Sequence, residues 1–254
     1  MAPVSVLVDP IRALRVFGLE EGGSFSEKVL YIYNKQLEEA DLVVISKCDL
    51  LDEARLGSLR AAVAARFPCK EILEVSPREG IGLEPWFAKI ASAEQAAGEA
   101  MKVDYTVYAD GEALLGWLNC TVQLSAKKTF DADKFLTELA GEMQARLQAE
   151  GAEVAHLKMT LSPKDGLSKL GVVNLVRNDF VPELSMALEA PVERGELTIN
   201  MRAEAAPAFL GRVVRQSLAV VASASPTLEA ELDHLEHFRP GKPTPTHRFE
   251  KVAA

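Results

Sequence analysis

Four consecutive residues, Ser46, Lys47, Cys48 and Asp49, come directly after an apolar run and could together recognise a purine base. The Asp49 carboxylate can accept two hydrogen bonds at once, from the ring N1–H and the exocyclic amine of guanine, which adenine does not offer in that arrangement. The methylene stem of Lys47 can lie along the plane of the base. Ligands of open α/β sheets bind beyond the carboxyl ends of the strands, which is where this motif falls.

A second segment of similar character lies one helix further along the chain. Ser76, Pro77 and Arg78 follow another apolar run, and Gly80 and Gly82 come soon after them. The spacing places both segments at the ends of consecutive strands, so they could act on one ligand.

Residues 3 to 92 resemble the base-recognising half of the CobW/HypB/UreG GTPases, a class concerned with cobalamin synthesis and metal delivery. Ser46–Asp49 is similar to the family's [N/S]KxD motif, and Ser76 to Leu83 is similar to its SAxxGxGL loop. The stretch from Lys35 to Asp41 and the strand that ends at Asp9 match the family in the same order. The resemblance implies that GTP or GDP, with Mg²⁺, is the cofactor.

The resemblance also assigns roles to particular residues. It implies that Asp49 reads guanine, that Lys47 stacks on it, and that backbone N–H groups near Ser76 contact the guanine carbonyl. The implied nucleotide-binding set is Ser46, Lys47, Asp49, Ser76, Pro77 and Arg78. No catalytic residue and no metal ligand is assigned.

The part of such a GTPase that binds phosphate is missing from this sequence. The only Gly-Lys pair, Gly241 and Lys242, is followed by Pro243, so there is no GxxxxGK[ST] motif. The family's CxCC metal-binding motif is absent as well. We therefore expect weak or no nucleotide binding by this chain alone, and no hydrolysis without a partner.

The first hundred residues must position these motifs, and their pattern is that of alternating strands and helices. Apolar runs at residues 4–8, 41–46 and 71–76 predict buried strands, and helical spacing predicts helices at 26–40, 53–67 and from residue 83 to about 99. This order is typical of a parallel α/β sheet covered on both faces, here an incomplete Rossmann-like sheet of three βα units.

Three strands leave an open sheet edge, which favours association. We considered three explanations: the chain is a fragment of a longer GTPase, it pairs with a partner that carries the P-loop, or it is an adaptor that associates with itself through this edge.

The second half of the sequence has a different pattern. Its strands alternate apolar and polar residues, as along 118–124, 155–161 and 197–203, which is typical of a sheet with one wet face. With two amphipathic helices between the strands, the order predicts an α+β domain of split βαβ, ferredoxin-like type. We place the domain boundary near residue 98, giving domains 1–98 and 99–254, the second with a Pro-rich tail and a role in interaction or metal delivery.

Composition excludes several classes of function. The net charge of −9 and the lack of basic runs argue against nucleic acid as a partner. No apolar run is long enough to span a membrane, no signal peptide is recognisable, and three widely spaced cysteines do not form a disulfide framework, so we expect a cytoplasmic protein.

One cluster of ligand-type residues was considered as a metal site. His234 and Glu236 share one face of a predicted strand, His237 lies on the other, and His247 follows in the tail. We interpret them as solvated side chains.

The sequence therefore predicts a GTP-binding metallochaperone or metallocofactor-insertion protein, present here without its P-loop, with an unidentified metal and an unidentified metalloprotein client. The alternative is a non-catalytic adaptor descended from such a GTPase, in which residues 46–49 are structural.

Overall fold

The computed structural model describes residues 2–92, 111, 113–164, 169–225 and 227–241. The chain forms two compact units, Met1–Gly111 with Lys242–Ala254 and Glu112–Gly241, and each is described by itself. The predicted boundary near residue 98, the end of the third predicted helix and most of the Pro-rich tail lie outside the described residues.

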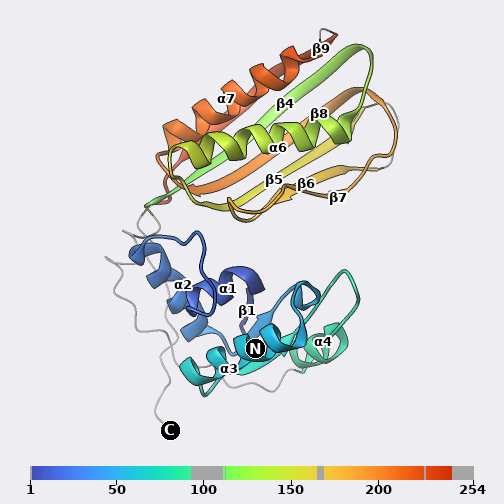
Figure 1. The fold of residues 1–254 in the computed structure, drawn as a ribbon. Coiled ribbons are helices and arrows are strands. Elements are labelled where there is room, and N and C mark those ends of the chain that lie inside the picture. The colour runs from blue at the N-terminus through green and yellow to red at the C-terminus, as the bar shows by residue number, and fades with distance from the viewer. Residues whose placement is uncertain (1, 93–110, 112, 165–168, 226, 242–254) are drawn as a thin grey trace. The chain divides into compact units, whose positions relative to one another are not determined.

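The first unit contains a three-stranded parallel sheet, which confirms the α/β prediction (Figure 1). Its order is β1-β2-β3, so β2 is central and β1 and β3 are edges. All four residues of β2 are buried, as its uninterrupted apolar run predicts. The elements are β1 (Ser5–Val8), α1 (Pro10–Val16), α2 (Glu27–Glu39), β2 (Leu42–Ile45), the 3₁₀ turn η1 (Cys48–Leu50), α3 (Glu53–Arg66), β3 (Glu71–Glu74) and α4 (Leu83–Ala91).

Helices cover both faces of this sheet. On one face, Val43 and Ile45 belong to a core that includes Leu14 of α1 and Leu59 of α3. On the other face, Val44 and its neighbours pack against α4, whose Trp86 Nε1 donates to Ser5 Oγ at 3.1 Å. Near the β1 edge this second face is incompletely covered among the described residues, because Leu7 is 51% exposed.

The second unit is a six-stranded antiparallel sheet with two helices on one of its faces (Figure 1). The strand order is β7-β6-β5-β8-β4-β9, and the β9-β4-β8-β5 part, with its two helices, has the split βαβ ferredoxin-like arrangement that the sequence predicts. The elements are β4 (Leu115–Phe130), α6 (Ala132–Ala149), β5 (Val154–Pro163), β6 (Gly171–Leu175), β7 (Glu183–Met186), β8 (Val192–Glu204), α7 (Pro207–Ser223) and β9 (Leu228–Phe238).

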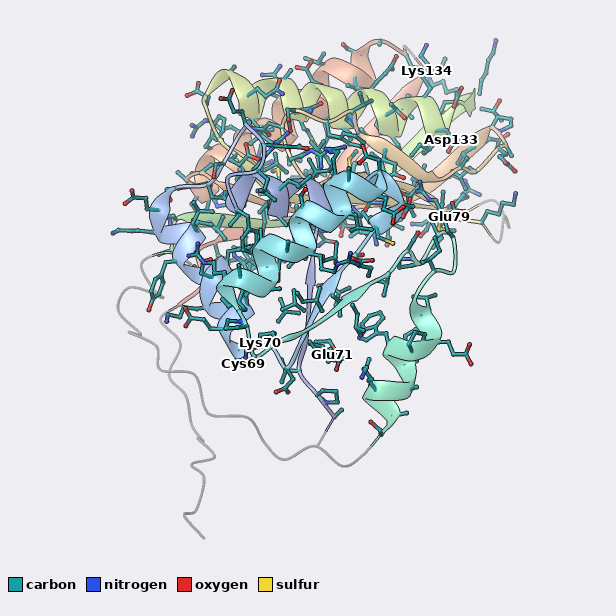
Figure 2. The ribbon with its side chains drawn as sticks, turned by 60° about the horizontal axis from the view of Figure 1, so that its bottom comes forward. Cys69, Lys70, Glu71, Glu79, Asp133 and Lys134 are labelled. Atoms are coloured by element: carbon teal, nitrogen blue, oxygen red, sulfur yellow. The ribbon has the colours of Figure 1, made fainter. Side chains whose placement is uncertain are left out.

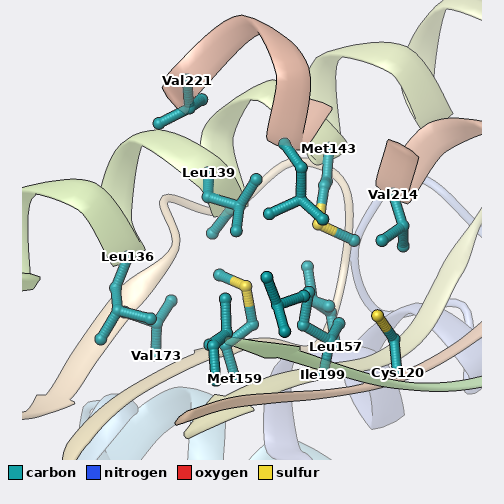
Figure 3. Packing of buried hydrophobic residues seen from close by; sticks show 14 of the residues in the cluster. Cys120, Leu136, Leu139, Met143, Leu157, Met159, Val173, Ile199, Val214 and Val221 are labelled. Atoms are coloured by element: carbon teal, nitrogen blue, oxygen red, sulfur yellow. The ribbon is translucent and has the colours of Figure 1, made fainter. Parts of the chain in front are cut away.

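A single apolar core fills the space between this sheet and its helices. Figure 3 shows Leu139 and Met143 of α6 above Leu157 and Ile199 of the sheet, and all four side chains are fully buried. Every second residue of β4, β5 and β8 points toward the helices and forms the sheet side of this core. The residues between them are more polar and point to the opposite face of the sheet. In the part of the chain that the structure describes, no helix is long and apolar enough to cross a membrane.

Candidate functional site

The carboxyl end of β2 carries the first predicted motif. Beyond the strand, Ser46 N–H donates to the Val8 carbonyl of β1 at 3.0 Å, and Cys48 N–H donates to the Val75 carbonyl beyond β3 at 3.1 Å. Lys47 lies between them in the left-handed region, at φ 53° and ψ 40°, which is uncommon for a residue other than glycine. Backbone bonds to both neighbouring strands thus hold this loop in its sharp turn.

Lys47 reaches across the end of β1. Its Nζ lies 3.3 Å from Asp9 Oδ2, and Asp9 Oδ1 accepts from Arg12 N–H at 3.1 Å as the N-cap of α1. The lysine is 42% exposed, so this ion pair stabilises the fold by at most about 1 kcal/mol. Its effect is to fix the direction of the lysine stem over the sheet end.

Asp49 presents its carboxylate to solvent. The residue is exposed, and none of the described residues forms a hydrogen bond or an ion pair with its side chain. The pKa of the neighbouring Cys48 thiol is raised, first by burial and then by the charges of Asp49 and Glu74. The thiol is therefore protonated and packed, whereas the carboxylate beside it is available to a ligand.

The second predicted loop closes on itself after β3. Ser76 is fully buried and exchanges two backbone hydrogen bonds with Ile81, both at 3.0 Å, while its Oγ accepts from Glu79 N–H at 3.2 Å. Pro77 and Arg78 form the exposed tip. Figure 2 shows Glu79 of this loop at one end of β3, with Cys69, Lys70 and Glu71 at the other end.

Glycine is required where this loop meets α4. Gly82 has φ +68°, and a Cβ placed on it would lie 2.1 Å from the Glu74 carbonyl oxygen. The loop therefore approaches β3 more closely than any side chain allows.

A pocket of about 410 Å³ adjoins both loops in unit 1. Asp49 lines it, but Ser46, Lys47, Ser76, Pro77 and Arg78 are not among its lining residues, so the structure brings one residue of the predicted set to the cavity. The pocket is lined by Cys48, Asp49, Leu51, Glu53, Leu56, Gly57, Arg60, Glu74 and Ile81. Its size is within the range of small-molecule sites.

One face of α3 forms the wall that sequence reasoning missed. Glu53, Gly57 and Arg60 succeed one another at helical spacing along this wall, and Arg60 Nη1 lies 3.0 Å from Glu74 Oε1 of β3. The i, i+4, i+7 spacing of these polar and small residues was visible in the sequence and could have indicated a helix face turned toward a ligand.

The histidines that the sequence analysis considered as a metal site do not meet on one side of β9. His237 packs beside Gly211 of α7, away from His234, whose Nε2 lies 4.0 Å from Glu236 on β9. Across the described ranges, no three His, Cys, Asp or Glu residues are grouped to hold a metal ion, and His247 lies outside these ranges.

A second pocket, of about 320 Å³, lies in unit 2 at the start of α6. Its Asp133 carboxylate accepts the backbone N–H groups of Leu188 and Glu189, which is a structural role.

Comparison with known proteins finds no matching family model and no matching curated protein. Two solved structures are similar: the Zn(II)-bound YjiA GTPase from E. coli, at 12% identity and a TM-score of 0.30, and a Zn(II)-bound triple mutant of YjiA GTPase, at 13% and 0.29. Each match covers 87% of this chain and 61% of the other chain, so this chain spans less than two thirds of the proteins it matches. At these scores the similarity transfers no residue role.

Proposed function

We propose that unit 1 binds the base of a guanine nucleotide at the carboxyl ends of its strands, as the base-recognising part of a CobW-like GTP-binding protein. The observation that carries this proposal is the Asp49 carboxylate, which is exposed at the pocket and has no partner among the described residues. A loop fixed by backbone bonds to both neighbouring strands holds it there.

The chemistry at this position selects guanine. The two oxygens of Asp49 accept from N1–H and from the exocyclic amine of the base, while the Lys47 stem, directed by its pairing with Asp9, supports the face of the ring. The resemblance assigns a donor for the base carbonyl to the loop of Ser76 to Arg78, but Ser76 N–H is bonded to the Ile81 carbonyl and Pro77 has no N–H, so we assign no donor there. Each hydrogen bond to a charged group contributes about 1.5–3 kcal/mol.

The same residues do not provide a phosphate site. In such GTPases a P-loop and Mg²⁺ supply much of the nucleotide affinity and neutralise the charge that develops during hydrolysis. Because the sequence has no GxxxxGK[ST], we assign no hydrolytic step to this chain. We propose that a partner bearing the P-loop binds along β1, whose outer edge has no partner strand in the described sheet and whose Leu7 is half exposed.

The wider role follows from the family resemblance. We propose that the complete assembly couples GTP binding to the loading of a metal or metallocofactor into a client protein in the cytoplasm, with unit 2 as the interacting or delivering part.

One observation favours a non-catalytic adaptor instead. Residues 46–49 are already held by backbone bonds to Val8 and Val75 and by the Lys47–Asp9 pair, so the motif has a structural role without any ligand.

The test exchanges the hydrogen-bonding character of Asp49. Asp49→Asn removes one acceptor and adds a donor, which suits xanthine, because xanthine has a carbonyl where guanine has its amine. Asp52→Asn is the matched control: it makes the same change in charge three residues away, where Asp52 caps α3 by accepting from Arg55 N–H, and asparagine caps as well. Binding of GDP, ADP and xanthosine diphosphate is measured by ligand-observed NMR at millimolar nucleotide.

We expect the native chain to prefer GDP to ADP. Asp49→Asn should weaken GDP binding by roughly 10- to 100-fold and improve binding of xanthosine diphosphate, whereas Asp52→Asn should change neither. Equal binding of GDP and ADP by the native chain would refute the guanine assignment. In that case a loss of stability in Asp49→Asn would support the adaptor.

A further inference from the structure

The sheet of unit 2 has a face that neither α6 nor α7 covers. Alternate residues of β9, β4, β8 and β5 point to this side, which we call the open face. Asn200 Nδ2 of β8 donates to Asn119 Oδ1 of β4 at 2.7 Å, which shows that these side chains lie together on it. Because this face is polar, its charged side chains indicate what it could bind.

Charge is distributed unevenly across the open face. The edge strand β9 carries four carboxylates on this side: Glu229, Glu231, Asp233 and Glu236. Three strands away, β5 carries Lys158, with no carboxylate on the same side of the strand. The two strands between them have mainly neutral Asn and Thr side chains at their centre. Over these four strands the face is thus acidic along β9, whereas β5 carries a lysine. Beyond β5, Asn174 of β6 stands opposite Lys158, and Glu183 of β7 stands opposite Asn174.

The strand register aligns opposite charges in one row. Glu236 stands opposite Asn119, Asn119 opposite Asn200, and Asn200 opposite Lys158. Three strand spacings, about 14 Å, separate the two ends of this row, so Glu236 and Lys158 of one chain are too far apart to pair. Lys158 forms no ion pair within the described residues, and His234 Nε2 lies 4.0 Å from Glu236, a contact that is an ion pair only when the imidazole is protonated.

We propose that two copies of this chain pair through their open faces, about a two-fold axis that runs parallel to the strands between β4 and β8. This axis places β9 of one copy over β5 of the other. Residues in register across the strands of one copy then face the same set of residues in the other copy. Glu236 of each copy then faces Lys158 of the other, and sheets packed about 10 Å apart bring the two side chains within reach.

Electrostatics selects this axis over the alternative. An axis that runs across the strands would place β9 over β9 and bring the four carboxylates of one copy against those of the other. The parallel axis also places Trp117 over Arg202 of the other copy, which extends the stack already present in one chain, where the Arg202 Cζ lies 3.4 Å from the Trp117 ring centroid. Every contact occurs twice, as a two-fold interface requires.

The dimer is weak and sensitive to salt. Four strands of this length present about 30 Å by 19 Å, or roughly 550 Å² per copy. The total of roughly 1,100 Å² is at the lower end for specific complexes. Since its centre is polar, charge pairs that are screened by salt decide whether it forms.

The experiment uses charge reversal in the full chain. Lys158→Glu and Glu236→Lys are each made singly, and the association of each is compared with that of the native chain by sedimentation at low and high ionic strength. Both residues are exposed, so the variants are expected to fold, and circular dichroism confirms it. Because the two-fold repeats each contact, either reversal should weaken self-association roughly tenfold.

Mixing the two variants gives the decisive result. A Lys158→Glu copy offers two carboxylates where a Glu236→Lys copy offers two lysines, so the equimolar mixture should associate as tightly as the native chain. The matched controls are Lys134→Glu and Glu138→Lys, an exposed pair 3.7 Å apart on α6, on the other side of the sheet (Lys134 in Figure 2). They make the same changes in charge and should leave association unchanged.

Three outcomes would overturn the proposal. The native chain could remain monomeric at low salt up to about 0.5 mM, the range in which an interface this small is expected to form. The mixture could fail to restore association. All variants could dimerise equally, which would place self-association on another surface such as the β1 edge.

Discussion

Gly82 lies where the loop after β3 turns into α4, and two features oppose any side chain there. Its φ of +68° is a conformation that costs a residue with a Cβ about 1–2 kcal/mol. A Cβ would also stand 2.1 Å from the Glu74 carbonyl oxygen and 3.3 Å from Val75 Cγ1. Backbone cannot move aside as a flexible side chain can, so Gly82→Ala must displace the loop from β3.

Gly80 provides the matched control for this substitution. Its φ is +71°, almost that of Gly82, but a Cβ there meets nothing within 4 Å. Gly80→Ala should therefore lower the free energy of unfolding of unit 1 by about 1–2 kcal/mol. Gly82→Ala adds an overpacking cost of about 1–3 kcal/mol, for a total of about 2–5 kcal/mol.

Urea unfolding followed by tryptophan fluorescence measures this difference. The chain has two tryptophans, Trp86 in unit 1 and Trp117 in unit 2, so a Trp117→Phe background leaves a single reporter in the affected unit. Trp86 also lies in the helix that begins after Gly82, so the probe is close to the perturbation. Equal destabilisation by Gly80→Ala and Gly82→Ala would show that contact with the Glu74 carbonyl oxygen does not add to the cost of a Cβ at Gly82, which would refute the prediction.

Three further predictions concern unit 2 and the thiols. Leu139→Ala, in the core of Figure 3, should lower the free energy of unfolding of unit 2 by about 2–5 kcal/mol and leave the Trp86 transition unchanged. The pKa of His156 is lowered, first by partial burial of its ring and then by Lys158 and Arg202, so the unfolded chain binds the proton more readily than the folded chain. Unit 2 should therefore lose stability as the pH falls below about 6.5. Urea titrations at different pH should show that His156→Gln reduces this loss. Mass spectrometry should show that the native chain takes up one equivalent of iodoacetamide, at the exposed Cys69. Burial raises the pKa of Cys120 to about 11 and also raises the pKa of Cys48, so these two buried thiols should react slowly. Rapid labelling of Cys48 or Cys120 would contradict this prediction.

Periodicity in the sequence was sufficient to predict most elements of both units. The three apolar runs of unit 1 became parallel strands, because continuous apolar residues suit a sheet covered on both faces, but only β2 is buried along its whole length. Strict alternation along residues 118–124 and 197–203 correctly predicted a sheet with one apolar face. The apolar runs and the alternating pattern are both local features of the sequence, and the packing of the folded units agrees with both.

Two elements escaped because their local signal was misread or absent. Helix α1 begins at Pro10, directly after the predicted strand that ends at Asp9, and we did not predict it, although proline at the first helical position after an Asp cap is favourable. Strand β7 exposes most of its four residues, so its sequence shows no alternation of apolar and polar residues. It is a strand because it pairs with β6.

The sequence predicted the two loops that adjoin the pocket, although only Asp49 of the predicted residues lines it, and it did not predict the helix face that forms its wall. Ser46–Asp49 and Ser76 are recognisable because each motif is contiguous in the chain. The contact between Arg60 and Glu74 joins a helix to a strand, and the Lys47–Asp9 pair joins two strands; such tertiary contacts are decided only when the sheet forms.

The place of β4 in its sheet has a consequence for synthesis on the ribosome. It is the first strand of unit 2 to be made, yet its two neighbours, β8 and β9, are the last two. An emerging chain therefore holds a sixteen-residue strand with both edges unpaired until β8 has left the exit tunnel, and with one edge unpaired until Phe238 has left it. Pairing between such distant segments is slow to form, and exposed strand edges aggregate, so this stretch of the nascent chain is where a holdase chaperone has most to protect.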